Sequence, residues 1–261
     1  MLQFRPNGTP SVKDRTVTLS SDTPLPLASR AGPLRQLFTD PRIVIAEVDP
    51  RLVAPGAGLF PEEATCIANA VDSRRRQFTA GRLLARRAWQ ELGVAPSALL
   101  NDEQRVPVWP AGIVGSITHT QGWCGAAVAR ARELGSVGAD VEAASALESG
   151  LWQRVCRPEE RDFLGRHEPG LAGLLAKAIF SAKESIYKAL YPTVRVFLDF
   201  QAMHIELTPG APGSWVWQAE LQVPWGAYRA GERFGPGRLG IDAEWIVSGI
   251  TLGPERLKTK R

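Results

Sequence analysis

The stretch FSAKESIYK, from Phe180 to Lys188, lies within a strongly periodic part of the sequence. Its pattern predicts an amphipathic helix from about Leu171 to Leu190, ended by Tyr191-Pro192. Glu184 and Lys188 are four residues apart, so they share one face of that helix. The two could form an ordinary surface ion pair, or they could be a metal ligand or base beside a stabilising cation. The spacing alone leaves both interpretations open. The apolar stripe consists of Leu175, Ile179, Ala182, Ile186 and Ala189.

The composition of the 261-residue chain is that of an ordinary globular protein, with 44% hydrophobic and 22% charged residues. Its net charge of +4 is small for a nucleic-acid-binding protein, but it favours an acidic partner or a phosphorylated ligand. The cysteines Cys66, Cys124 and Cys156 form no C-x-x-C pair, which argues against a zinc site or a disulfide framework. We find neither a signal-peptide core nor an apolar run of membrane-spanning length. We therefore expect a soluble cytoplasmic protein.

The N-terminal third predicts an arm, a strand and two helices. Residues 1–40 are rich in Pro, Ser, Thr and Gly, which indicates an irregular arm. Ile43–Val48 is apolar and β-branched, as expected of a strand. Pro61 suits the first turn of a short helix. A second helix is expected from Arg74 to Leu92, and Asp72 or Ser73 could cap it.

This second helix carries six arginines. On a regular helix Arg75, Arg82 and Arg86 share a face. That face could simply be solvated, or it could bind phosphate, because a guanidinium fork matches phosphate oxygens. The full set is Arg74, Arg75, Arg76, Arg82, Arg86 and Arg87.

Two short blocks carry further polar residues. In Gly115–His119, a glycine and small hydroxyl residues could bring backbone amides close to a phosphate, and His119 could be structural or functional. Gly122–Ala129 and Ser136–Glu142 both look like strands, and together they predict a β-hairpin. Asp140 and Glu142 would then point to one side of a strand. That face could be solvent-exposed, or its carboxylates could hold Mg²⁺ or Mn²⁺ rather than zinc.

The rest of the chain predicts helices followed by an antiparallel sheet. Glu148–Gly165 has a helical pattern, with a new turn beginning near Pro158. In three later segments apolar and polar residues alternate, as they do in β-strands, and turn-forming residues at 208–213 and 231–237 separate these segments. We expect this sheet to pack against the Leu171–Leu190 helix. The three segments are Phe200–Leu207, Trp215–Val223 and Leu239–Leu252.

Three blocks in this order resemble the Sfp/EntD superfamily of 4'-phosphopantetheinyl transferases. The family patterns are G-S-x-x-H, G-x-D-x-E and [FW]-x-x-K-E-[SA]-x-x-K, which match Gly115–His119, Gly138–Glu142 and Phe180–Lys188. The arginine-rich helix and Pro107–Pro110 are similar to the EntD-like branch, so the resemblance extends over about Arg74–Asp199. Each block alone would be weak evidence for the family, but three blocks in this order, at the spacing that the family shows, are specific evidence.

The chain departs from the family pattern in two places. Gln77 stands where the family often has Glu, which removes a local salt bridge rather than the chemistry. The loop before Pro107 has Asn101, Gln104 and Arg105 where some relatives have lysines. Arg105 is then the expected phosphate contact of that loop.

The resemblance implies an α+β fold made of two similar halves related by a pseudo-twofold axis. Their border is expected near Leu134, with an N-terminal half at 41–133 and a C-terminal half at 134–261. The active site would lie in the cleft between the halves, a common position for ligand pockets. The implied protein is a monomer.

The resemblance also implies the reaction. The family transfers 4'-phosphopantetheine from coenzyme A to a serine of an apo acyl or peptidyl carrier protein, and releases adenosine 3',5'-bisphosphate. Asp140, Glu142 and Glu184 are the implied ligands of Mg²⁺, with Mn²⁺ as a substitute, held against the pyrophosphate of the coenzyme. Glu184, or a metal-bound water, would deprotonate the serine, and Lys188 would stabilise the leaving bisphosphate. The implied phosphate contacts are Arg74 (rather than Arg75), Arg82, Arg105, Thr118 and a protonated His119.

Two other functions fit parts of the pattern. A metal-dependent phosphatase or nucleotide hydrolase could use the same carboxylates, and a basic module could bind nucleic acid through the arginine helix. The transferase interpretation joins all the blocks, so we expect no nucleic-acid or membrane partner. An acidic carrier would suit the positive charge. The sequence does not distinguish carriers of fatty-acid, polyketide or siderophore (enterobactin-type) synthesis.

Overall fold

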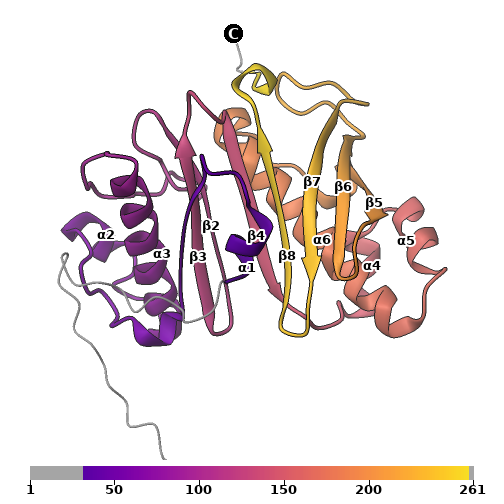
Figure 1. Ribbon diagram of the computed structural model, residues 1–261, viewed down its shortest axis with the longest axis horizontal. Coiled ribbons are helices and arrows are strands. Elements are labelled where there is room, and N and C mark those ends of the chain that lie inside the picture. Colours follow the sequence, from indigo (N-terminus) through magenta and orange to yellow (C-terminus); the bar gives the residue numbers. More distant parts are fainter. Residues whose placement is uncertain (1–31, 259–261) are drawn as a thin grey trace, which may run out of the picture.

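Two antiparallel β-sheets lie side by side at the centre of the molecule (Figure 1). The computed structural model describes residues 32–258. The first sheet has the order β1-β3-β2 and uses residues 44–130, whereas the second has the order β4-β8-β7-β6-β5 and uses residues 136–252. The strands are β1 (Val44–Val48), β2 (Ile113–Thr120), β3 (Trp123–Arg130), β4 (Ser136–Ala143), β5 (Met203–Pro209), β6 (Ser214–Leu221), β7 (Arg233–Ile241) and β8 (Trp245–Leu252).

Helices cover both faces of these sheets. α3 packs its apolar stripe on the first sheet, and α6 packs on the second. The short α1 lies over the opposite face, where Leu34 and Leu37 are buried against strands of both sheets. The fold is therefore α+β, as predicted. The helices are α1 (Pro33–Leu37), α2 (Pro61–Thr65), α3 (Asp72–Glu91), α4 (Ser149–Val155), α5 (Pro158–Leu164) and α6 (Pro169–Val194), with short 3-10 turns at Pro50–Leu52, Phe200–Ala202 and Pro254–Arg256.

The predicted hairpin between Gly122–Ala129 and Ser136–Glu142 is wrong. β3 pairs with β1 and β2, whereas β4 pairs with β8 in the other sheet. The reason is the turn between β2 and β3, where Gly122 takes a positive φ of 77°. Glycine adopts this left-handed conformation readily, so a tight turn can join β2 to β3. The connection between β3 and β4 is longer, and these two strands do not pair as a hairpin.

Hydroxyl groups join the two sheets where β2 meets β4. Ser116 Oγ accepts a hydrogen bond from the Ala139 amide at 3.1 Å and donates to the Ala139 carbonyl at 3.2 Å. Thr118 Oγ1 accepts from the Val141 amide at 3.1 Å and lies 3.3 Å from Asp140 Oδ1. These side chains satisfy buried backbone groups between strands of different sheets. The G-S-x-x-H block therefore positions the acidic strand.

The arginine helix begins earlier and is less exposed than expected. Val71 is its N-terminal cap residue and makes no side-chain cap, so the predicted cap at Asp72 or Ser73 is wrong. The Asp72 carboxylate instead accepts from Arg76 at 2.8 Å. Arg86 is buried and paired with Glu63 at 3.0 Å. Burial of an arginine beside a carboxylate shows that this face of the helix is internal rather than solvated.

The motif helix α6 continues through Pro192 to Val194, so its predicted end at Tyr191-Pro192 is wrong. Proline removes one helical hydrogen bond, but Tyr191 and Val194 are buried and hold the last turn in place. The residue that caps its C-terminus, Arg195, adopts a left-handed φ of 57°. Packing thus overrides the local helix-stopping signal.

The C-terminal segments form an antiparallel sheet, with one change in their boundaries. Leu239–Leu252 is not one strand, because the Asp242 side chain accepts from the Glu244 and Trp245 amides and makes a turn between β7 and β8. Most of the predicted turn at 231–237 belongs to β7. Of the predicted irregular arm, residues 32–40 include α1, and residues 1–31 lie outside the described part. Within residues 32–258, no helix is long and apolar enough to cross a membrane.

Candidate active site

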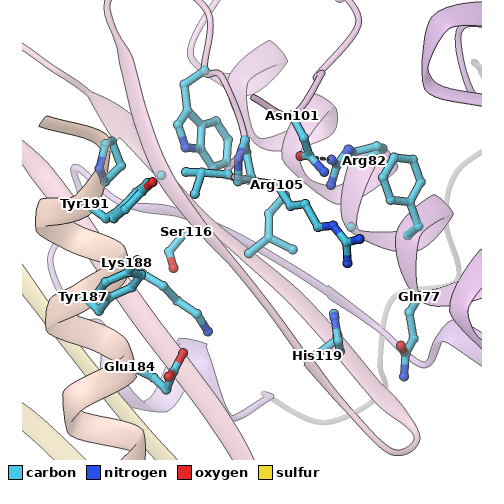
Figure 2. Close-up of a pocket in the computed structure, with 18 of the residues that line it drawn as sticks. Gln77, Arg82, Asn101, Arg105, Ser116, His119, Glu184, Tyr187, Lys188 and Tyr191 are labelled. Atoms are coloured by element: carbon cyan, nitrogen blue, oxygen red, sulfur yellow. Dashed lines mark hydrogen bonds between the residues drawn. The ribbon is translucent and has the colours of Figure 1, made fainter. Parts of the chain in front are cut away.

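A cavity of about 270 Å³ lies between α3, the loop at 101–109, β2 and α6 (Figure 2). It lies on the side of the sheets that α3 and α6 cover, since both helices contribute to its lining. Glu184 and Lys188 enter it from α6, while His119 and Arg105 lie across from them on the first half of the chain. The predicted site residues that line it are Arg74, Arg82, Arg105, His119, Glu184 and Lys188.

Lys188 forms an ion pair with Asp140, not with its helical neighbour Glu184. Lys188 Nζ lies 2.7 Å from Asp140 Oδ1 and 3.4 Å from the Ala139 carbonyl oxygen. The close approach of α6 to β4 at Gly138 makes this possible, because a Cβ there would stand 1.9 Å from the Ser185 carbonyl oxygen. Burial lowers the pKa of Lys188, but the charges of Asp140 and Glu184 outweigh burial and raise it. The ammonium is therefore charged at neutral pH.

Asp140, Glu142 and Glu184 place negative charge around this ion pair. Asp140 is buried, and its Oδ2 atom has no hydrogen-bond partner within residues 32–258. Burial and then the charge of Asp140 raise the pKa of Glu142 to about 6. Burial also raises the pKa of Glu184, with Lys188 opposing the shift and Asp140 adding to it. The carboxylates thus repel one another.

This donor set fits a hard divalent cation in part. An unpartnered buried carboxylate oxygen and mutual repulsion are conditions that a cation relieves, and oxygen ligands suit Mg²⁺. Asp140 and Glu142 do not line the cavity, however. In the described residues, no three acidic, histidine or cysteine side chains are gathered closely enough to form a complete metal site. The protein therefore offers some, but not all, of an oxygen-ligand shell.

At the opposite end of the cavity, Arg74 contacts His119. Arg74 Nη1 lies 2.9 Å from His119 Nε2. Burial, followed by the charges of Arg74 and Lys188, lowers the pKa of His119 to about 4, so the imidazole is neutral at pH 7. Arg75 does not line the cavity, and its Nε atom is buried without a partner in the described part of the chain. The family position, Arg74, thus agrees with the geometry better than the regular-helix argument for Arg75.

Arg82 and Arg105 differ in their exposure to solvent and in their contacts. Arg82 is buried over the Phe78 ring, where its guanidinium donates to the Leu99 carbonyl and to Asn101 Oδ1. Burial lowers the pKa of Arg82 to about 10, which still leaves the group charged at pH 7. Arg105 is exposed, has a left-handed φ of 65° and points into the cavity (Figure 2). Arg82 therefore supports the loop, while Arg105 is available to a ligand.

The loop that carries Arg105 is organised by Asp102. One Asp102 oxygen accepts from the Gln104 and Val106 amides at 3.0 and 2.8 Å. The other forms an ion pair with Arg195, just beyond α6. Asp102 thus connects the cavity loop of the first half to the end of the motif helix.

Thr118 has a different place from the other predicted phosphate contacts. It is 3% exposed and does not line the cavity. Its hydroxyl is engaged with the Val141 amide and Asp140, as described for the contact between the sheets. The structure therefore places Thr118 behind the site, where it positions the acidic strand.

Comparison with known proteins identifies the family to which the chain belongs. The family model described as "4'-phosphopantetheinyl transferase N-terminal domain" matches residues 62–129, and that described as "4'-phosphopantetheinyl transferase superfamily" matches residues 136–229. The 4'-phosphopantetheinyl transferase Svp of Streptomyces mobaraensis is 39% identical over 201 residues, covering 74% of this chain and 76% of Svp. The chain belongs to the 4'-phosphopantetheinyl transferase superfamily.

Two other relatives support the same family membership. The 4'-phosphopantetheinyl transferase Npt of Nocardia iowensis is 37% identical over 192 residues, which cover 72% of this chain and 84% of Npt. Enterobactin synthase component D of Escherichia coli K12 is 35% identical over 132 residues, covering 49% of this chain and 61% of that protein. The predicted family, with its EntD-like branch, and the prediction of a transferase enzyme are confirmed.

Several residues that line the cavity were not among the predicted site residues. Tyr187 and Tyr191 line the cavity beside Glu184 and Lys188, and Tyr187 stacks on Trp225 with ring centroids 5.8 Å apart. Tyr187 and Tyr191 lie three and seven positions after Glu184 and so share its face of the helix, a spacing that could have identified them. Asn101, Ser116 and Trp109 also line the cavity. All three lie in segments that the sequence had singled out, but only loop and strand packing shows that their side chains reach the cavity.

Proposed function

We propose that this transferase moves 4'-phosphopantetheine from coenzyme A to a serine of an apo acyl or peptidyl carrier protein, with Mg²⁺, and releases adenosine 3',5'-bisphosphate. One observation carries the proposal: a single cavity joins Glu184 and Lys188 of α6 to the cationic end at Arg74, Arg105 and His119. Such a cavity suits a ligand with separated phosphates, one of which must react.

The cationic end would bind the coenzyme phosphates. Arg74 and Arg105 offer guanidinium forks that match phosphate oxygens. His119 is neutral without ligand, and a phosphate dianion nearby would favour its protonated form. Arg82 would act mainly through Asn101, which it holds at the edge of the cavity. We assign Thr118 to positioning rather than to ligand contact.

Asp140, Glu142 and Glu184 would hold Mg²⁺, or Mn²⁺ in its place. When bound, the ion would screen the charge on the pyrophosphate. Lys188 already neutralises part of the charge of Asp140, at a distance of 2.7 Å. Its ammonium would also stabilise the negative charge that develops on the departing bisphosphate.

The reaction would be a phosphoryl transfer in which Glu184 takes the proton. The serine oxygen forms a bond to the phosphorus that carries pantetheine, and the bond from that phosphorus to the bridging oxygen breaks. Because burial raises the pKa of Glu184, its carboxylate is a better proton acceptor than an ordinary one. A metal-bound water is the alternative base.

A smaller apolar hollow lies next to the main cavity. It encloses about 100 Å³ and shares Glu184 and Tyr187 with the larger one. Phe197, Leu198 and Phe200 make up much of its wall. We infer that it accommodates the pantetheine arm, because this arm must continue away from the phosphates past the reacting phosphorus.

The partners and the setting of the enzyme follow from the same proposal. We infer a monomeric cytoplasmic enzyme whose second substrate is an acidic carrier protein of fatty-acid, polyketide or siderophore synthesis. We infer no nucleic-acid partner, because Arg82 and Arg86 of the arginine helix are buried and occupied by internal acceptors. A face made of such residues is unsuited to contacting a phosphate backbone.

The experiment is transfer from a fluorescent coenzyme A to a panel of apo-carriers, with Mg²⁺, with Mn²⁺ and with EDTA. We expect metal-dependent labelling of at least one carrier, and none when its acceptor serine is replaced by alanine. Several apo-carriers that stay unlabelled with Mg²⁺ would contradict the proposal. Release of phosphate from nucleotides in the absence of carrier would instead favour a hydrolase. Relative turnover across the panel would identify the preferred carrier.

A further inference from the structure

Lys183 lies in the centre of the FSAKESIYK motif but has no place in the proposed reaction. Its side chain is 2% exposed and does not line the main cavity, although Lys183 is one of the residues that line the apolar hollow. An ammonium group has three hydrogens to donate. Lys183 Nζ lies 2.8 Å from the Val155 carbonyl, 2.8 Å from Glu160 Oε2 and 2.9 Å from the Phe200 carbonyl. All three hydrogens therefore have protein acceptors, and none remains for a phosphate.

Glu160 is as buried as Lys183, and both of its carboxylate oxygens accept hydrogen bonds from the protein. Its Oε2 atom also accepts from the Arg157 amide at 2.7 Å, and its Oε1 atom accepts from the Ile205 amide at 2.6 Å. His204 Nδ1 lies 3.7 Å from the same Oε1 atom. The Lys183–Glu160 pair thus connects α6 to the end of α4, the start of α5, the turn at Phe200–Ala202 and strand β5.

This network holds α6 at Lys183, whereas the contact with β4 is made at Ser185 and Lys188. Adjacent residues on an α-helix point about 100° apart around its axis. Anchoring Lys183 therefore determines the direction in which Glu184 points. The carbonyl of Phe200 is one of the anchors, and the Phe200 side chain also lines the apolar hollow beside Glu184. One buried ammonium thus joins the helix to a wall of that hollow.

We propose that Lys183 is a positioning residue, which acts through Glu160 and the Phe200 carbonyl to hold the Glu184 carboxylate at the reacting centre. The proposal rests on the proposed function of Glu184. Reacting groups must be held within fractions of an ångström, and a displacement of about 1 Å can reduce a rate by roughly a hundredfold. Loss of the anchor is therefore expected to reduce turnover more than coenzyme binding.

The test compares Lys183→Met with the double variant Lys183→Met/Glu160→Gln. The single change leaves Glu160 as an unpaired buried charge, so it can unfold the protein. The double change removes both charges, and the glutamine oxygen still accepts from one backbone amide. Lys258→Met is a matched control, because Lys258 pairs with Glu232 on the surface, far along the chain from the motif. The readouts are kcat, KM for coenzyme A, melting temperature and amide hydrogen exchange of residues 180–188.

In the double variant we expect kcat to fall by about tenfold or more, with KM for coenzyme A changed less than about threefold. We also expect faster exchange at residues 180–188 and a melting temperature closer to wild type than that of the single variant. Wild-type kcat in the double variant, or unchanged exchange in α6, would overturn the proposal. A raised KM with unchanged kcat would make Lys183 a ligand contact instead. If the wild-type protein transfers nothing, the proposed function fails, while the exchange experiment still decides whether Lys183 holds the helix.

Discussion

At the scale of single residues, the site depends on side chains whose protonation is set by their surroundings. Glu184 has a raised pKa because it is buried, and His119 has a pKa of about 4 because it is buried beside Arg74 and Lys188. Lys188 stays charged because acidic groups surround it. Perturbed groups gathered at one cavity are typical of catalytic sites.

Replacing Glu184 with glutamine keeps the size of the side chain and removes the proton acceptor. We expect kcat for transfer to fall by about a hundredfold or more, the usual contribution of a general base. Binding of coenzyme A without metal, measured by calorimetry, should change little. A variant that retains wild-type kcat would show that Glu184 is not the base and would favour a metal-bound water. Glu148→Gln, on an exposed position before α4, is the matched control.

His119 should contribute to the pH dependence of stability. Its pKa falls from 6.5 in an unfolded chain to about 4 in the folded protein, so the unfolded state binds more protons between these values. Stability is therefore lost as the pH falls from about 6.5 towards 4. In His119→Gln this contribution is absent, and the melting temperature should fall less between pH 7 and pH 5. Equal falls in both proteins would contradict the low pKa.

At the scale of elements, the decisive contact is that of α6 with β4. The periodicity of Leu175–Ala189 correctly predicts a helix and its buried face. It cannot predict how closely the helix approaches β4, because that distance depends on Gly138 in another element. The end of α6 also differs from the prediction, since the buried Tyr191 and Val194 stabilise a turn that contains Pro192.

Gly138→Ala tests this contact. A Cβ at this position would stand 1.9 Å from the Ser185 carbonyl oxygen and 2.8 Å from the Ala189 Cβ, so α6 must move away. We expect a loss of at least about 2 kcal/mol in unfolding free energy, measured with urea, together with reduced transfer. The control is Gly150→Ala in α4, where nothing lies within 4 Å. That change should leave stability unaltered or raise it by up to about 1 kcal/mol. Equal effects of the two changes would contradict the close contact.

At the scale of the whole molecule, the site lies where the two sheets meet. The first half supplies the cationic end, the second supplies Glu184 and Lys188, and the hydroxyls of Ser116 and Thr118 hold β2 against β4. The border expected near Leu134 and the pseudo-twofold axis stay predictions. Neither half alone contains a complete cavity, since its lining comes from both.

Recognition of a carrier protein should depend on ionic strength. The chain carries a net charge of +4, and an acidic carrier would be attracted over a distance that salt shortens. We expect KM for the carrier to rise several-fold between about 50 and 300 mM NaCl, with a smaller change in kcat. Steady-state kinetics at saturating coenzyme A would measure this. A KM that does not respond to salt would argue for docking through apolar contacts.

Residue type and spacing alone predict the three motif blocks and the helical face that carries Glu184 and Lys188, because these features lie within single elements. The α+β class is implied by the family resemblance that the three blocks carry. Tertiary structure decided the partners. Lys188 meets Asp140, 48 residues away, rather than Glu184, Thr118 is buried between the sheets, and Lys183 is anchored by Glu160. Such contacts depend on how separate elements pack, and no period within a single segment encodes that distance.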